Sequence, residues 1–218
     1  MEYTNRELLK HGSERLKAAG IAEADNDAWL LFSAATGMSR TDYFMRSADA
    51  VPADTAALYL RKLERREAHE PVQYIEGTAP FMGYEFVVNE NVLIPRMDTE
   101  ILVSEALKLA EIMYADRLRG TDFNILDMCT GSGCIARSVY LMLKKAGCET
   151  MVTAVDISDK ALEVAKLNAG RLGADISFIQ SDLFENVSGS FSMILSNPPY
   201  IRTDVIADLE PEVKEHEP

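Results

Sequence analysis

The chain has 218 residues, 47% of them apolar and 26% charged, which is enough to bury a sizeable core in an ordinary globular protein. Lys and Arg number 22 against 35 Asp and Glu, and the resulting net charge of −13 argues against a broad phosphate-binding face. We therefore expect no direct nucleic-acid partner, although an acidic surface would attract a basic protein.

The three cysteines form no CxxC pair and the three histidines are scattered, so neither a zinc site nor a simple disulfide framework is expected. Reduced thiols of this kind are typical of the cytoplasm. The N-terminus has no apolar signal core, and no apolar run approaches the ~20 residues that span a bilayer. We expect a soluble, cytoplasmic protein that binds neither a metal nor a membrane.

The first seventy residues have the pattern of a small helical bundle. Thr4 and Glu7 form a capping box at the start of the first helix. Gly20 and Gly37 each follow an apolar helical pattern and predict where two helices end. Residues 1–70 are therefore predicted to be a helical N-terminal domain, whose role would be substrate recognition.

From Pro71 onward the texture changes to short β-rich runs separated by Gly, Pro and Asn. The runs are Tyr74–Gly77, Phe81–Val88 and Val92–Ile94. We predict a β-hairpin linker over residues 71–97.

Residues 98–218 are predicted to form an α/β domain with a Rossmann-like parallel sheet. Asp98 or Thr99 is expected to cap its first helix. Beyond that helix, apolar strands alternate with helices, which indicates parallel βαβ units covered on both faces. The strands are expected at Phe123–Met128, Met151–Val155, Ile176–Ile179 and Phe191–Leu195.

A glycine-rich turn follows the first of these strands and opens a helix, which is where open α/β sheets bind their ligands. Gly131 and Gly133 allow a ligand to approach the backbone closely. Asp127 precedes the glycines and would suit a cationic group such as an amino acid ammonium. Asp156 ends the second strand, where it could accept from a ribose diol, and Asp182 follows the third strand, where it could read an adenine edge.

This turn alone does not identify the cofactor. Gly131, Gly133 and Ala136 also satisfy the dinucleotide fingerprint, with an acidic residue about 20 positions on. The carboxylate of Asp127 disfavours a pyrophosphate, and no catalytic set for a nicotinamide enzyme is present. An NAD dehydrogenase is therefore the weakest alternative.

A second motif, Asn197-Pro198-Pro199-Tyr200, follows the fourth strand. The two prolines stiffen the turn and remove backbone donors, so it presents mainly carbonyl acceptors. Asn197 offers an acceptor and two donors on a neutral group, and Tyr200 offers a flat face. This set matches a planar group with an exocyclic NH2, whose hydrogens could go to Asn197 and to the backbone carbonyl of Pro198. The pattern favours methyl transfer to such a nitrogen, and it does not separate glutamine from adenine.

With both motifs present, the sequence resembles the HemK/PrmC family of peptide-chain release factor glutamine N5-methyltransferases. The resemblance covers the whole chain. It is carried by Glu70–Gly77, Phe81–Gly83, Val92–Glu100, the Gly131 turn and Asn197–Ile201.

The resemblance implies a class I methyltransferase that uses S-adenosylmethionine to methylate the glutamine of the Gly-Gly-Gln loop in release factors. It implies that Asn197 touches both cofactor and glutamine, and that Pro198 and Tyr200 complete the clamp. The cofactor would be bound by Thr130, Gly131, Ser132, Gly133 and Asp156.

Two residues depart from the family pattern. Cys129 stands where the family usually has glycine, which would slightly reshape the turn. Leu183 stands where some relatives carry an aromatic residue beside the adenine, so stacking there would be weaker. The chain also ends where relatives continue, and we expect a C-terminally truncated methyltransferase domain that lacks its last strands. We expect such a chain to have impaired stability and doubtful activity, with edge-to-edge association through an unpaired strand as a further expectation.

Three alternatives stronger than the dehydrogenase remain open from the sequence. A ribosomal protein glutamine methyltransferase shares the tetrapeptide, although the Pro95–Glu100 segment looks more like the release factor branch. A DNA adenine-N6 methyltransferase uses a similar tetrapeptide, and the net charge of −13 opposes it. The chain could also be an inactive cofactor-binding fragment.

Overall fold

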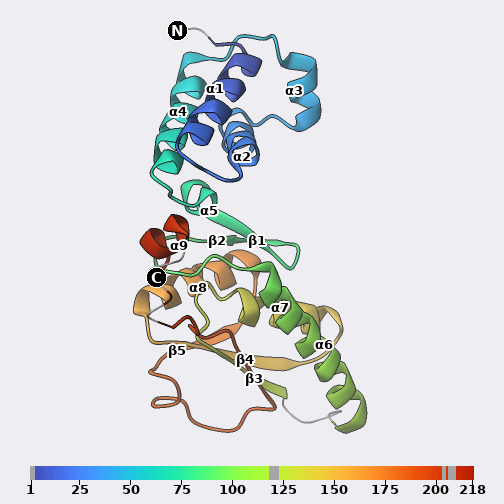
Figure 1. Cartoon of the computed structure of the whole chain (residues 1–218). Coiled ribbons are helices and arrows are strands. Elements are labelled where there is room, and N and C mark those ends of the chain that lie inside the picture. Colours follow the sequence, from blue (N-terminus) through green and yellow to red (C-terminus); the bar gives the residue numbers. More distant parts are fainter. Residues whose placement is uncertain (1–2, 118–122, 203–204, 206–209) are drawn as a thin grey trace. The chain divides into compact units, whose positions relative to one another are not determined.

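A computed structural model describes residues 3–117, 123–202, 205 and 210–218 (Figure 1). The chain divides into two compact units. One comprises Met1–Gly77 with Leu209–His216, and the other comprises Thr78–Asp208 with Glu217–Pro218. Across the described residues we find no helix whose length and apolar character would let it cross a bilayer.

The first unit is helical, and its local signals act as expected. The Thr4 side chain accepts from the Glu7 N–H while Glu7 reaches back to the Thr4 N–H, which completes the predicted capping box. Leu16, Phe32 and Leu63 are fully buried in its core. The helices are α1 (Asn5–Ala18), α2 (Ala24–Thr36), α3 (Arg40–Arg46), α4 (Ala53–Glu67), α5 (Val72–Glu76) and α9 (Pro211–His216).

The first β-rich run was predicted wrongly, because Tyr74–Gly77 belongs mostly to α5. Pro71 precedes this helix with φ −56° and ψ 139°, and Gly77 ends it in the left-handed conformation at φ 75°. These flanking residues outweigh the β propensity of the aromatic and branched side chains between them. The third run, Val92–Ile94, forms no strand either, although Val92 and Ile94 are buried.

The expected hairpin is present, but the middle run supplies only its turn and second strand, because the first strand begins at Thr78. Strands β1 (Thr78–Phe81) and β2 (Tyr84–Val87) pair antiparallel. The two residues between them, Met82 and Gly83, both have positive φ, as a tight two-residue hairpin turn requires.

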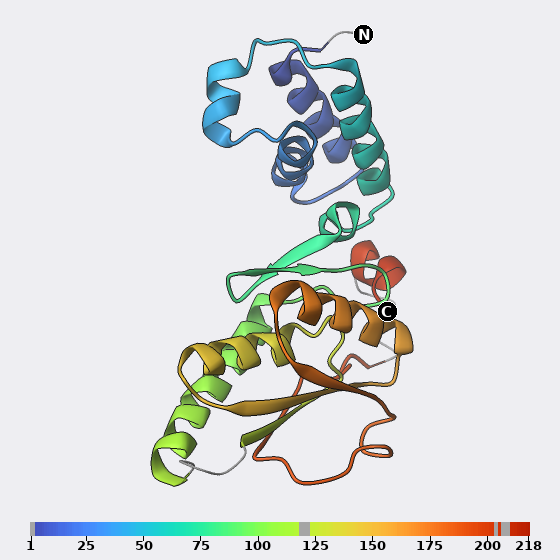
Figure 2. The same ribbon diagram turned by 180° about the vertical axis from the view of Figure 1, so that it is seen from behind.

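A parallel sheet forms the centre of the second unit, with the strand order β5-β4-β3-β6. Helices α6, α7 and α8 lie on one face, and the segment after β5 crosses the other (Figures 1 and 2). Ile125 faces the helical core, while its neighbour Leu126 packs with Phe191 on the opposite face. The elements are α6 (Met97–Arg117), β3 (Phe123–Met128), α7 (Cys134–Lys145), β4 (Thr150–Asp156), α8 (Asp159–Leu172), β5 (Ile176–Gln180) and β6 (Met193–Ser196).

This architecture confirms the expected α/β fold class. Among the described residues, β6 pairs only with β3 and so lies at an edge of the sheet. The association expected through that edge stays a prediction.

Candidate active site

The two motifs found in the sequence lie side by side at the carboxyl ends of neighbouring strands. Strands β3 and β6 run parallel, with Asp127 opposite Leu195 and Met128 opposite Ser196. The Ser196 hydroxyl also donates to the Met128 carbonyl at 2.8 Å. The glycine turn, which follows β3, therefore lies next to Asn197, which follows β6.

Asp127 fixes the glycine turn through two hydrogen bonds. Its Oδ2 atom accepts from the Thr130 hydroxyl at 2.5 Å and from the Ala136 N–H at 3.0 Å. The side chain has no exposed surface, and this burial raises the pKa of Asp127 to about 7, while the two hydrogen bonds act in the opposite direction. Because the carboxylate already occupies an N–H of the first turn of α7, it takes a donor that a pyrophosphate would need.

Asp156 connects the glycine turn to the end of β4. Its Oδ2 atom accepts from the Gly131 N–H at 2.9 Å, and its Oδ1 atom accepts from the Ser158 N–H at 3.0 Å. A carboxylate has about four acceptor positions, so two further hydrogens could still be accepted. This half-buried group therefore fits the ribose diol that the sequence predicts for it.

Features of the turn fit an adenosyl amino acid. A Cβ built on Gly131 meets nothing within 4 Å, so the backbone faces open space there. The Asp127 Oδ1 and Ser132 Oγ atoms are buried and have no hydrogen-bond partner among the described residues. Buried polar atoms without partners are uncommon and often mark the place of a further polar group. Thr130 and Gly133 complete the turn, since the Gly133 N–H donates to the Thr130 carbonyl at 2.9 Å.

Asp182 and Leu183 follow β5, and both side chains are exposed. The Asp182 carbonyl accepts from the Glu185 N–H at 3.1 Å, so a short turn presents the two residues. Leu183 adopts a left-handed backbone at φ 47° and is 54% exposed. Their predicted contacts with the adenine stay predictions.

In the tetrapeptide, Pro198, Pro199 and Tyr200 are exposed and Asn197 is half-buried. Tyr200 has 78% of its surface exposed, so its ring face is available for packing. The Asn197 side chain donates a hydrogen bond from its Nδ2 atom to the Thr99 hydroxyl at 3.2 Å. The clamp for a planar NH2 group that the sequence predicts at this turn stays a prediction.

Residues with no recognisable site motif support this arrangement. Asp98 or Thr99 was expected to cap a helix, but α6 begins at Met97 and places both residues inside its first turn. Asn168, on α8, donates to the Ser132 carbonyl at 2.9 Å and so braces the glycine turn. The only sequence signal for Asn168 was its position on the apolar side of the helical pattern. That position predicts that the side chain is buried, but it does not predict which groups it bonds to.

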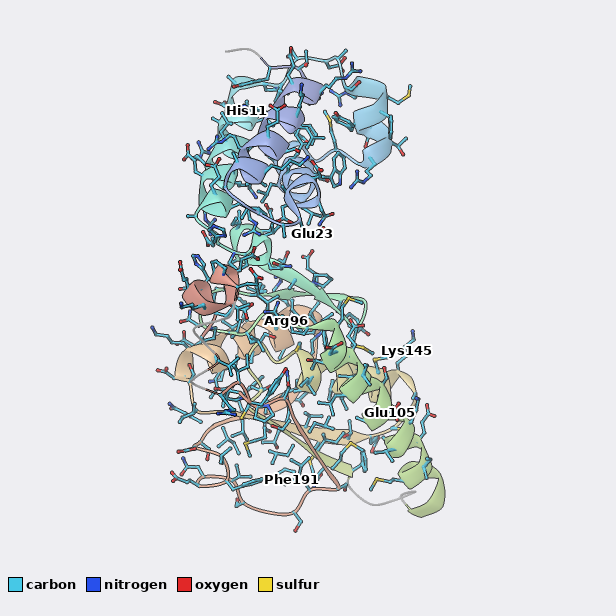
Figure 3. All side chains as sticks on the ribbon, viewed as in Figure 1. His11, Glu23, Arg96, Glu105, Lys145 and Phe191 are labelled. Carbon is cyan, nitrogen blue, oxygen red and sulfur yellow. The ribbon has the colours of Figure 1, made fainter. Side chains whose placement is uncertain are left out.

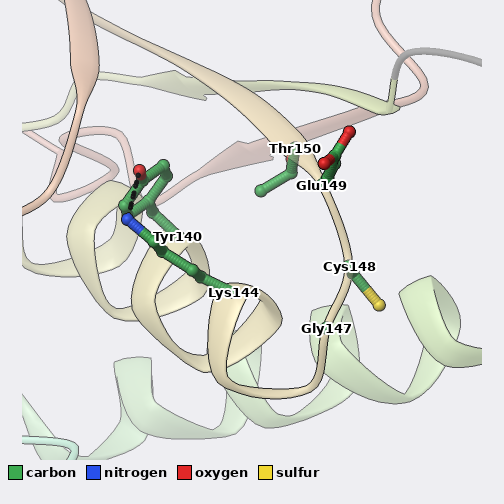
Figure 4. A pocket seen from close by; sticks show the side chains of 6 residues that line it. All are labelled: Tyr140, Lys144, Gly147, Cys148, Glu149 and Thr150. Carbon is green, nitrogen blue, oxygen red and sulfur yellow. Dashed lines mark hydrogen bonds between the residues drawn. The ribbon is translucent and has the colours of Figure 1, made fainter.

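A surface pocket lies elsewhere in the same unit (Figure 4). It is lined by the end of α7 and the start of β4, where Lys144 donates to the Tyr140 hydroxyl at 3.3 Å. None of the residues predicted for the site lines it. Thr150 is the first residue of β4 and Asp156 is the last, so the pocket lies at the end of that strand away from Asp156.

The chain matches two family models. Residues 7–77 match the PrmC N-terminal domain, and residues 104–209 match the Methyltransferase small domain. A release factor glutamine methyltransferase of Agrobacterium fabrum is 42% identical over 94% of this chain and 69% of its own length. The enzyme of the same name from Bacillus subtilis is 39% identical over 97% of this chain and 72% of its own length.

The chain belongs to the release factor glutamine methyltransferase family. The resemblance stated from the sequence is confirmed, and with it the methyltransferase class and S-adenosylmethionine as the cofactor. A ribosomal protein L11 methylase from Lactobacillus delbrueckii subsp. bulgaricus is 26% identical over 56% of each chain, with a TM-score of 0.37.

Proposed function

We propose that this chain transfers the methyl group of S-adenosylmethionine to the side-chain amide nitrogen of glutamine in the Gly-Gly-Gln loop of peptide-chain release factors. The observation that carries the proposal is the pairing of Met128 with Ser196, which sets the cofactor-type turn beside Asn197. The names of the relatives at 42% and 39% identity support the substrate. The chain would act in the cytoplasm, where release factors act. It would make no direct contact with nucleic acid.

In this proposal the cofactor supplies an electrophilic methyl group on a sulfonium, and the chain positions the two reactants. Thr130, Gly131, Ser132 and Gly133 would hold the cofactor backbone, with Asp127 toward its ammonium. Asp156 would accept from the ribose, and Asp182 and Leu183 would border the adenine.

The protein's contribution at the reacting nitrogen would be orientation. An amide nitrogen is a poor nucleophile because its lone pair is delocalised. Asn197 Oδ1 and the Pro198 carbonyl would accept its two hydrogens, which raises electron density on nitrogen as positive charge develops. Tyr200 and Pro199 would flank the planar group and hold it in line with the methyl carbon. The nitrogen would take the methyl group as the sulfur–carbon bond of the cofactor broke, and one amide proton would leave to solvent.

The two units would divide the work. Residues 1–70 would recognise the release factor, the hairpin segment 71–97 would connect, and residues 98–218 would carry the reaction. Residues 7–77 match the model of the PrmC N-terminal domain, which supports a role in recognising the substrate.

The test is transfer of a labelled methyl group from S-adenosylmethionine to a release factor, alongside a release factor whose loop glutamine is replaced by alanine. We expect label only in the unaltered factor. Asn197→Ala should lower kcat at least about 100-fold, while Asn91→Ala, a control in the 88–96 segment, should not. Label in both factors, or in neither, would overturn the proposal, and duplex DNA added as substrate should stay unlabelled.

A further inference from the structure

Thr99 and Asn197 are 98 positions apart in the chain, yet their side chains are joined by a hydrogen bond. Thr99 lies in the first turn of α6, just after the segment that Arg96 marks in Figure 3, and it is only 8% exposed. Its own N–H donates to the Arg96 carbonyl at 3.0 Å. The Thr99 hydroxyl therefore meets the amide of Asn197 as a buried partner rather than as an exposed helix cap.

The direction of this bond has a chemical consequence. The oxygen and nitrogen of an asparagine amide leave the same carbon in different directions, and only the nitrogen donates. With Nδ2 engaged by the Thr99 oxygen, Oδ1 is turned away from Thr99. A substrate NH2 group donates hydrogen bonds, so it needs the amide oxygen of Asn197 opposite it and not the amide NH2.

The first turn of α6 is itself held in place. The neighbour of Thr99, Glu100, accepts from the Met82 N–H at 2.6 Å through its Oε1 atom. Met82 occupies the tight turn of the hairpin with φ 50°. The Thr99 hydroxyl therefore projects from the first turn of a helix that is anchored through the adjacent residue, Glu100. Groups carried by helices are held more precisely than groups carried by loops.

We infer that Thr99 is a positioning residue that sets the amide orientation of Asn197, so that its Oδ1 atom accepts a hydrogen from the substrate NH2. The role in turnover rests on the proposed function, and the hydrogen bond does not. Thr99 touches neither substrate nor cofactor in this scheme and acts only through Asn197.

The kinetic test compares Thr99→Val, which keeps the shape and removes the hydroxyl, with Thr99→Ser, which keeps the hydroxyl. We expect Thr99→Val to lower kcat about tenfold, with KM for cofactor and release factor unchanged, and Thr99→Ser to stay within about threefold of the original chain. Thermal midpoints of both variants control for folding. Equal kcat values in the two variants, or a loss confined to KM, would overturn the inference.

A spectroscopic test needs no turnover. In chain labelled with nitrogen-15 at asparagine, the Asn197 side-chain amide signals are those that vanish in Asn197→Ala. We expect slow hydrogen exchange of one amide proton in the original chain and in Thr99→Ser, and faster exchange with a changed shift in Thr99→Val. Identical signals in all three would show that Nδ2 does not donate to Thr99 and would overturn the inference. Failure of the unaltered chain to methylate a release factor would instead count against the proposed function, and the amide signals would still decide the bond.

Discussion

The side-chain amide of Asn168 pairs with the backbone of Val87 much as a neighbouring strand would. Its Oδ1 atom accepts from the Val87 N–H at 2.7 Å, and its Nδ2 atom donates to the Val87 carbonyl at 3.0 Å. The same Nδ2 atom donates to the Ser132 carbonyl at 2.9 Å. One fully buried residue on α8 thus joins the hairpin to the glycine turn.

Replacement of Asn168 by leucine should therefore destabilise the chain strongly. Leucine has a similar size but leaves the Val87 N–H, the Val87 carbonyl and the Ser132 carbonyl without this partner. Unpaired groups of this kind cost about 1–3 kcal/mol each, so we expect a loss of about 3 kcal/mol in the free energy of unfolding. Urea denaturation measures it, with Lys166→Leu on the exposed face of α8 as the control. Equal stability of the two variants would contradict the bracing role of Asn168.

Gly131 and Gly133 should respond differently to alanine. At Gly133, with φ +77°, a Cβ would lie 3.1 Å from the Ala165 Cβ atom, so strain and collision add, and we expect a loss of about 2–3 kcal/mol of stability. At Gly131, with φ +53°, a Cβ meets open space, so the strain is limited to about 1 kcal/mol.

The expected difference lies in cofactor binding. The Gly131→Ala methyl group would take up the space into which we place the cofactor, so S-adenosylmethionine affinity should fall at least about tenfold. Calorimetric titration alongside denaturation separates the two effects. Unchanged affinity in Gly131→Ala would remove this glycine from the cofactor site.

Stability of the cofactor-free chain should fall as the pH rises from about 4 to about 7, in part because of Asp127. Burial raises the pKa of this carboxyl from 3.8 to about 7 in the folded chain. Below the lower value it is protonated in both states and contributes nothing. Above it, the unfolded chain loses the proton first, so unfolding becomes easier until the folded-state pKa is passed.

Asp127→Asn should abolish this contribution, because asparagine is neutral throughout and can still accept from Thr130 and Ala136. The difference in unfolding free energy between the two proteins should change with pH by at most about 1.4 kcal/mol per unit within that window. Denaturation curves at several pH values measure it. A difference that is constant with pH would show that burial does not raise this pKa.

Cys129→Gly should stabilise the glycine turn. Cys129 has φ 61°, a left-handed backbone that L side chains adopt only with strain. Relative to Cys129→Ala, which keeps the strain but shortens the side chain, we expect the glycine variant to be about 1 kcal/mol more stable. Thermal denaturation decides it. An alanine variant as stable as the glycine variant would mean that the turn carries no strain at this position.

Short, contiguous patterns determined much of this protein. Four features depend only on neighbours in sequence, so elementary propensities and motifs predict them. They are the capping box at Thr4, the alternation of strands and helices after Phe123, the glycine turn and the Asn197 tetrapeptide. The α5 segment was missed because Pro71 and Gly77 outweighed the β propensity between them.

Contacts between distant positions were decided only by the tertiary structure. Asn197 meets Thr99 across 98 positions, and Asn168 meets Val87 across 81. No local pattern distinguishes Thr99 as a buried partner from Thr99 as a helix cap, because the choice depends on what packs against the first turn of α6. The sequence by itself determined which chemistry the chain carries, and the packing of hairpin, helices and sheet decided how the groups that perform it are held.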